Sequence, residues 1–276
     1  MVMPLYDDAP LKYVKRPIVN HTLIAINAVV FLIVVSEMFG DPLAVIRGFA
    51  IIPKILFGEA ELADWVAGPP APMTIVTALF FHSSIWHLLT NLLFLHVFGD
   101  NVEDAMGSLF YLLFYLCCGS AAGVFYVYSA PDSITPLIGA SGAISGVCVA
   151  FMLLHPNATV AGIFPPMVGV LMPAWLVLWL TGRAREKLFG LRPPLFIFHA
   201  SAWLFIAVWI FLQLFEATTS GGGHIAWMNH VGGICAGLVM TPLFKRRSVA
   251  MLGSASLARQ SAGASQDRST EPDGDA

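Results

Sequence analysis

Two polar residues that could carry out nucleophilic chemistry lie where an apolar chain should avoid them. Ser141 follows Gly139 and Ala140 at the start of one apolar segment, and His230 lies near the start of another. A serine hydroxyl is a poor nucleophile until a base takes its proton, and a neutral imidazole is the usual base. Burying either group in hydrocarbon is costly, so the pair predicts a functional site.

The composition identifies the environment of these segments. The chain of 276 residues is 57% hydrophobic and 11% charged, and no charged residue occurs between Asp132 and Arg183. These features exclude an ordinary soluble domain and predict a multi-pass protein of the lipid bilayer. The net charge of −3 is uninformative about partners, and no nucleic-acid partner is expected. The four cysteines lie in apolar runs without the spacing of metal ligands, so they are expected to be small core residues rather than disulfides or metal ligands.

Hydropathy predicts an all-α membrane protein with six transmembrane helices, each close to the roughly 20 residues that a bilayer requires. The expected spans cover about residues 22–39, 73–98, 108–128, 138–154, 196–215 and 227–244. Basic residues before the first span and after the last place both termini in the cytoplasm. We expect a cytoplasmic N-terminal segment at 1–16, a transmembrane domain at 17–247 and a disordered cytoplasmic tail at 248–276. Without a transit-peptide pattern, the expected location is a bacterial inner membrane.

The predicted topology brings the polar residues to one depth. The fourth and sixth spans both run inward, so Ser141 and His230 lie near the outer surface together. The second span also runs inward, and its outer end carries His82, His87 and Asn91. His87 and Asn91 are one helical turn apart and share a face. An interhelical hydrogen bond for Asn91 or an interfacial position for His87 would explain either residue alone, but the convergence of the set favours one pocket.

These residues predict an intramembrane serine protease. The expected spans place no Asp or Glu near His230, so a Ser141–His230 dyad without a carboxylate is expected. The Ser141 backbone N–H, the Asn91 amide and His87 could stabilise the oxyanion of the tetrahedral intermediate.

Small residues provide the close packing that the dyad needs. Gly142 and Gly146 on the fourth span and Gly233 and Gly237 on the sixth span have the four-residue spacing of helices whose backbones approach closely. Plain helix packing explains each pair equally well when it is taken alone.

Five motifs in this order resemble the rhomboid family of intramembrane serine proteases, over about residues 17–247. They are Phe81-His82, Trp86-His87-Leu88-Leu89-Thr90-Asn91, the run at 98–104, Gly139-Ala140-Ser141-Gly142 and the run at 227–233. The resemblance implies a six-helix bundle with Ser141 as nucleophile, His230 as base, and His87 and Asn91 at the oxyanion site. It implies single-pass transmembrane proteins as substrates, cut near the outer face, and no cofactor. It does not indicate an oligomeric state.

The chain departs from the family pattern at two places. Some members have an aromatic residue one turn after the nucleophile, where this chain has Ser145. The Ser145 hydroxyl could orient His230, or the residue could be small only for packing; His82 is a second candidate for a supporting role. An additional apolar run at 160–180, broken by three prolines, is expected to form a re-entrant or interfacial segment before the fifth helix.

Two other functions compete with proteolysis. The remaining histidines could suggest haem or metal ligation, but most map to inner ends of spans, and His82 and His87 lack the i,i+4 spacing of a zinc helix. A non-catalytic rhomboid-like chaperone or adaptor that binds membrane helices is the main alternative, and intact Ser141 and His230 argue against it.

Overall fold

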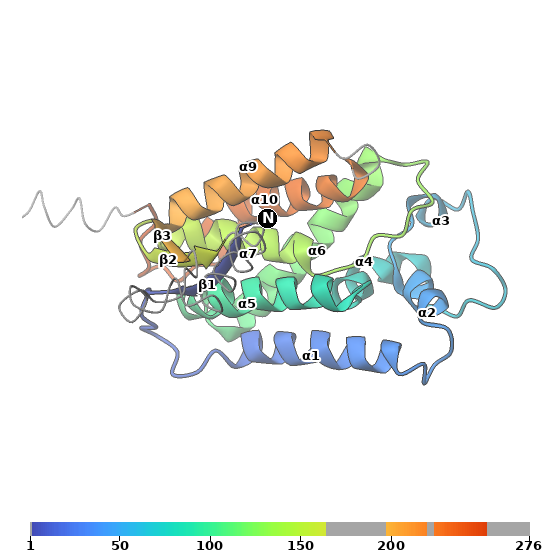
Figure 1. Ribbon diagram of the computed structural model, residues 1–276, viewed down its shortest axis with the longest axis horizontal. Coiled ribbons are helices and arrows are strands. Elements are labelled where there is room, and N and C mark those ends of the chain that lie inside the picture. Colours follow the sequence, from blue (N-terminus) through green and yellow to red (C-terminus); the bar gives the residue numbers. More distant parts are fainter. Residues whose placement is uncertain (1, 164–196, 220–223, 253–276) are drawn as a thin grey trace, which may run out of the picture.

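The computed structural model describes residues 2–163, 197–219 and 224–252. This part of the chain is mostly helical (Figure 1). Six of its helices have at least 14 residues: α1 (Ile18–Val35), α5 (Ile85–Met106), α6 (Ser108–Ser129), α7 (Ser141–Leu154), α9 (Ala202–Thr219) and α10 (His224–Phe244). Short helices connect α1 to α5: α2 (Pro42–Phe49), α3 (Pro53–Leu56), η1 (Ala71–Met73), α4 (Thr74–Thr77) and η2 (Ala78–Phe80).

The described residues contain helices suited to a membrane. By length and composition α1 and α6 could each cross a bilayer, and the bent pair 71–80 plus 85–106 makes a third candidate if it is one span. Helix α7 and the apolar part of α9 are shorter. The expectation of a helical membrane protein is confirmed at this level.

The second expected span is not one continuous helix. Its two parts meet at an angle of 77° across residues 81–84. Ser84 begins α5, since its side chain accepts a hydrogen bond from the His87 N–H at 3.2 Å. A serine at this position satisfies an N–H group that a helix start leaves without a partner.

At its other end α5 continues to Met106, through residues where a turn was expected after Phe98. Two carboxylates in this last part hold the N-terminal segment. Asp104 accepts hydrogen bonds from the backbone N–H groups of Lys12, Tyr13 and Val14, at 2.6–2.9 Å. Glu103 accepts from the N–H groups of Val19 and Asn20 at the start of α1. The acidic pair therefore fixes the N-terminal segment and the first helix to α5.

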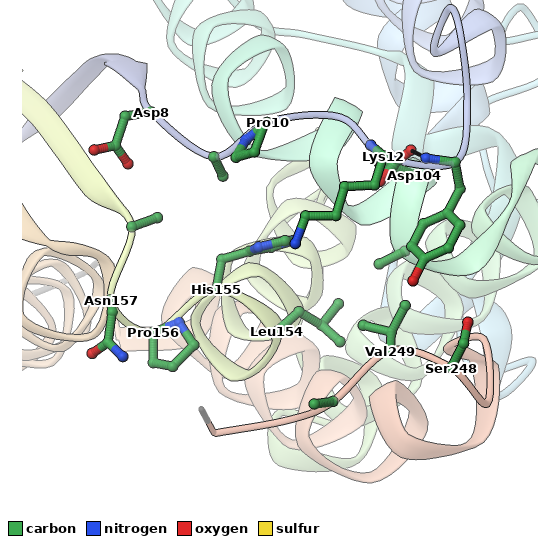
Figure 2. Close-up of a pocket in the computed structure, with 15 residues that line it drawn as sticks. Asp8, Pro10, Lys12, Asp104, Leu154, His155, Pro156, Asn157, Ser248 and Val249 are labelled. Atoms are coloured by element: carbon green, nitrogen blue, oxygen red, sulfur yellow. Dashed lines mark hydrogen bonds between the residues drawn. The ribbon is translucent and has the colours of Figure 1, made fainter. Parts of the chain in front are cut away.

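Figure 2 shows the pocket beside this contact, with the Lys12 side chain extending towards His155. The pocket has a volume of about 510 Å³, and the N-terminal segment and the C-terminal ends of α5 and α7 form much of its wall. After α10, residues 248–250 also line it, and the Leu252 N–H donates to the Leu153 carbonyl at 2.8 Å. Thus the beginning of the predicted tail packs against α7, while residues 253–276 lie outside the described part.

A small sheet corrects the all-α expectation. Strands β1 (Met3–Asp7), β2 (Thr159–Ile163) and β3 (Ile197–Ser201) form an antiparallel sheet in the order β1-β2-β3, at one end of the bundle (Figure 1). The expected N-terminal extension of the fifth helix to residue 196 is wrong, because β3 occupies 197–201 and α9 begins at Ala202. Pairing satisfies the backbone of both segments, which tertiary contacts can favour over local helix preference.

The same sheet takes up the start of the additional apolar run. Residues 160–163 belong to β2. The rest of the predicted re-entrant segment, 164–180, lies outside the described residues. Within the N-terminal segment, residues 3–7 supply β1 to the sheet, and residues 12–14 are hydrogen-bonded to Asp104 of α5.

The sheet contains a carboxyl group with an unusual proton affinity. Burial raises the pKa of Asp7 to about 6, and the negative charges of Asp100 and Asp8 act in the same direction. For an acid whose pKa is higher in the folded state, stability is lost as pH rises from the unfolded value, here 3.8, through the folded value of about 6. We expect Asp7→Asn to remove this loss, so that its melting temperature in detergent falls less than that of the wild type over this range.

Asp8→Asn is the matched control for Asp7→Asn. Hydrogen bonding to Thr159 lowers the pKa of Asp8, so its contribution is lost as pH falls and has the opposite sign. An Asp7→Asn protein with the wild-type pH profile of melting would contradict the assignment.

Candidate active site

One cavity of about 200 Å³ brings together residues from four helices. Helix α5 contributes four of them, α7 and α9 two each, and α10 one. The lining residues are His87, Thr90, Asn91, Phe94, Ser141, Ile144, Trp209, Gln213 and His230. Four residues named from the sequence, Ser141, His230, His87 and Asn91, therefore line the same cavity, although they are separated by up to 143 positions in the chain.

Ser141 is the first residue of α7. The turn before it depends on Gly139, whose φ of +116° is a backbone conformation that residues with a side chain rarely adopt. The Gly139 N–H donates to the Ala78 carbonyl at 2.9 Å. A Cβ at Gly139 would lie 2.7 Å from His87 Nε2, so the segment leading to the serine runs directly against this histidine.

His230 lies between two tryptophans. Its ring centroid is 5.4 Å from that of Trp227, nearly perpendicular, and 6.5 Å from that of Trp209. Its Nδ1 atom is buried and has no hydrogen-bond partner in the described part of the chain. Aromatic packing from α9 and from α10 itself thus flanks the imidazole, and none of the described residues that line this cavity is a carboxylate. Within the described part of the chain, no hydrogen bond joins Ser141 to His230.

The α5 residues form one wall of the cavity. Asn91 donates from Nδ2 to the His87 carbonyl at 2.9 Å, which leaves the second hydrogen of the amide for another acceptor. His87 Nδ1 is 3.2 Å from the Ser83 hydroxyl. His82 is not a lining residue; its ring packs edge to face on His87 at 5.0 Å. Its contact with His87 is consistent with a supporting position.

The Ser145 hydroxyl is hydrogen-bonded within its own helix. It donates to the Ser141 carbonyl at 2.8 Å, and the Ser145 side chain is fully buried. A Cβ at Gly233 would lie 3.1 Å from the Ser145 Cβ. These contacts favour the packing interpretation of Ser145 over a hydroxyl that orients His230.

The four glycines named from their spacing face one another across α7 and α10. A Cβ at Gly233 would collide with the Gly142 carbonyl oxygen, and one at Gly237 would lie 2.8 Å from the Gly146 Cα. Across the same contact the Asn229 side chain covers Gly142, whose added Cβ would lie 2.7 Å from Asn229 Oδ1. The two backbones therefore touch directly beside the cavity, which only glycine permits.

Sequence reasoning missed the contribution of α9. Trp209 and Gln213 line the cavity from this helix, one turn apart. A signal was available, since Gln213 is the one strongly polar residue in the apolar stretch Ala202–Phe215. A polar side chain within a span indicates function by the same reasoning that identified Asn91.

Part of this chain is similar to known proteins. The family model of the Rhomboid domain matches residues 70–188, which include Ser141 but end before His230. RHOMBOID-like protein 12 of Arabidopsis thaliana, a mitochondrial protein, is 29% identical over 121 residues, which are 38% of this chain and 36% of the relative. Rhomboid protein 1 of Saccharomyces cerevisiae, also mitochondrial, is 32% identical over 108 residues, 38% of this chain and 31% of the relative.

A third relative is the chloroplastic Rhomboid-like protein 11 of Arabidopsis thaliana. It is 36% identical over 85 residues, 31% of this chain and 30% of the relative. The matches thus span about a third of the length of these relatives.

The names of these relatives correct the expected location. All three are mitochondrial or chloroplastic proteins, so the expectation of a bacterial inner membrane with both termini in the cytoplasm is wrong. The choice of membrane rested on the lack of a recognised transit-peptide pattern, and the basic residues beside the spans distinguish the two sides of a membrane without identifying the membrane. The resemblance seen in the motifs, however, is confirmed by the family model and by the relatives: residues 70–188 match the Rhomboid domain, and the relatives are named as rhomboid proteins.

Proposed function

We propose that this protein is an intramembrane serine endopeptidase that uses a dyad of Ser141 and His230. The observation that carries the proposal is the cavity in which Ser141, at the start of α7, and His230, from α10, are lining residues together with His87 and Asn91. The similarity to the Rhomboid domain supports the same function, and the match of the family model includes the nucleophile.

The chemistry follows from the groups in the cavity. His230 accepts the Ser141 hydroxyl proton while Oγ attacks the carbonyl carbon of the scissile bond. The protonated imidazole then gives its proton to the leaving amide nitrogen, and the C–N bond breaks to leave an acyl-serine. Water attacks this ester, again with His230 as base, and Ser141 is restored. The hydrogen bond between serine and histidine that this requires can tighten when substrate binds.

The oxyanion would be stabilised from two sides. The Ser141 backbone N–H, at the start of a helix, favours negative charge, and the free hydrogen of the Asn91 amide and His87 Nε2 come from α5. Such donors are fixed before reaction, so they stabilise the transition state without reorganisation.

We expect Asn91→Ala to retain weak activity. Loss of one oxyanion donor costs about 2.7–4 kcal/mol of barrier, or roughly 10²–10³ in kcat. The measurement is the cleavage rate of a reconstituted substrate. Asn27→Ala is the matched control, because Asn27 on α1 is equally buried and makes the same amide-to-carbonyl bond one turn back, to Leu23 at 2.8 Å. Equal rates for the two variants would remove Asn91 from the oxyanion site.

The proposed substrates are single-pass transmembrane proteins, and the proposed location is a membrane of an organelle, as the names of the relatives suggest. We further propose that α1, the bent pair, α6, α7, α9 and α10 each cross the bilayer. The strongly exposed apolar side chains of Leu32 on α1 and Leu109 on α6 support contact with lipid.

Two measurements on the purified protein test the function. A fluorophosphonate should label Ser141 covalently, and a co-expressed single-pass membrane protein with a helix-destabilising segment should be cleaved. The alternative, a non-catalytic adaptor that binds membrane helices, predicts neither result. Absence of labelling in protein shown to be folded would overturn the protease assignment.

A further inference from the structure

Two polar side chains on α9 lie unpaired beside the dyad. Trp209 and Gln213 are 4% and 5% exposed, and both line the cavity that contains Ser141 and His230. The Trp209 indole nitrogen and the Gln213 amide nitrogen are buried, and neither has a hydrogen-bond partner within the part of the chain that the structure describes.

Packing alone does not explain these residue types. Most buried polar groups in proteins are hydrogen-bonded, and an unpaired donor costs folding stability. The surroundings of Trp209 are aromatic, with the Phe94 ring at 5.4 Å and the His230 ring at 6.5 Å. Phenylalanine at 209 and leucine at 213 would fill the same space without leaving a donor unpaired. The two N–H groups therefore fit an acceptor that a ligand brings into the cavity.

The spacing of the two donors indicates the ligand. Residues 209 and 213 are one helical turn apart, which separates their Cβ atoms by about 5–6 Å. In an extended peptide, carbonyl groups on the same side recur every two residues, or about 6.6 Å. An unwound segment of a membrane helix has such carbonyls without internal partners.

We propose that Gln213 and Trp209 donate hydrogen bonds to main-chain carbonyl oxygens of an extended substrate segment beside the scissile bond. This inference rests on the proposed protease function. It assigns α9 the role of binding the substrate main chain, whereas the α5 residues stabilise the oxyanion. Recognition through the main chain tolerates different substrate side chains and selects against segments that stay helical.

Gln213→Leu and Trp209→Phe test the proposal. Each variant should lower kcat/KM for a reconstituted substrate about tenfold, mainly through KM, since each removes one hydrogen bond to the substrate. The melting temperature should be unchanged or higher, because no internal hydrogen bond is lost. The rate of fluorophosphonate labelling of Ser141 should stay near that of the wild type, since this small probe has no extended backbone.

Trp203→Phe is the matched control on the same helix, as Trp203 is 52% exposed and is not a lining residue. Unchanged kcat/KM in Gln213→Leu would overturn the proposal. A Gln213→Leu protein in which the melting temperature, the labelling rate and the cleavage rate all fall would also overturn it, because that pattern indicates a structural role.

A binding measurement separates this proposal from the protease assignment. In a Ser141→Ala background, Gln213→Leu should weaken the binding of a labelled substrate segment about tenfold. If the wild-type protein neither reacts with fluorophosphonate nor cleaves the substrate, the protease function is overturned. If Gln213→Leu still weakens binding of the substrate segment in that case, the proposed α9 binding site stands without it. Binding that Gln213→Leu does not alter would reject the α9 site alone.

Discussion

Ser141→Ala should abolish proteolysis while the protein stays folded. Removing one member of a nucleophile–base pair costs as much as removing both, so we expect kcat to fall by about 10⁴–10⁶ in Ser141→Ala, in His230→Ala and in the double variant alike. Ser141 is only partly buried, and the structure gives its hydroxyl no hydrogen bond within the described residues, so the change to alanine should cost little stability. Cleavage of a reconstituted single-pass substrate measures the loss, and the melting temperature reports on folding.

Ser129→Ala is the control for this loss. Ser129 ends α6, and its hydroxyl bonds to the Tyr126 carbonyl at 2.8 Å, away from the cavity. The Ser129→Ala protein should cleave the substrate at the wild-type rate. Turnover by Ser141→Ala at a substantial fraction of the wild-type rate would show that another residue is the nucleophile.

Gly233→Ala should damage both stability and activity. An added Cβ at this position collides with the Gly142 carbonyl oxygen, which belongs to the α7 backbone and cannot rotate away. Overpacking of this kind typically costs about 1–3 kcal/mol. If α10 moves away from α7 to relieve the collision, His230 moves away from Ser141, and a displacement of about 1 Å can cost 10²-fold in rate.

Cys235→Ala, two residues further along α10, is the matched control for Gly233→Ala. The Cys235 side chain is exposed on the outer surface of the bundle, so its change should leave melting temperature and kcat near those of the wild type. Thermal unfolding in detergent and cleavage kinetics report the two effects separately. A Gly233→Ala protein as stable and active as the Cys235→Ala protein would contradict the close contact of the two helices.

Much of the catalytic region followed from residue types and their spacing. Serine, histidine and asparagine stand out in apolar segments because hydrocarbon penalises them, and the i,i+4 relation of His87 and Asn91 places them on one helix face whatever the rest of the fold does. The resemblance to the rhomboid family followed from motifs of the same kind. The location did not follow from the sequence, since charges beside the spans carry no information about which membrane contains them.

The tertiary structure decided what depends on contacts distant in the chain. Local patterns could not indicate that residues 197–201 pair with β2 as a strand, since pairing energy depends on the partner. Nor could they show that Glu103 and Asp104 bind the N-terminal segment, because a carboxylate in a helix can equally face water.

For His230 too, the sequence determined the residue type and the tertiary structure determined its neighbours. The sequence alone identified the histidine and the absence of a nearby carboxylate in the expected spans. Only the packing of α9 against α10 brought Trp209 and Gln213 to the cavity. Composition and periodicity determine which side chains are costly to bury and which helix face they occupy. The partner that each one meets depends on how the helices pack in three dimensions.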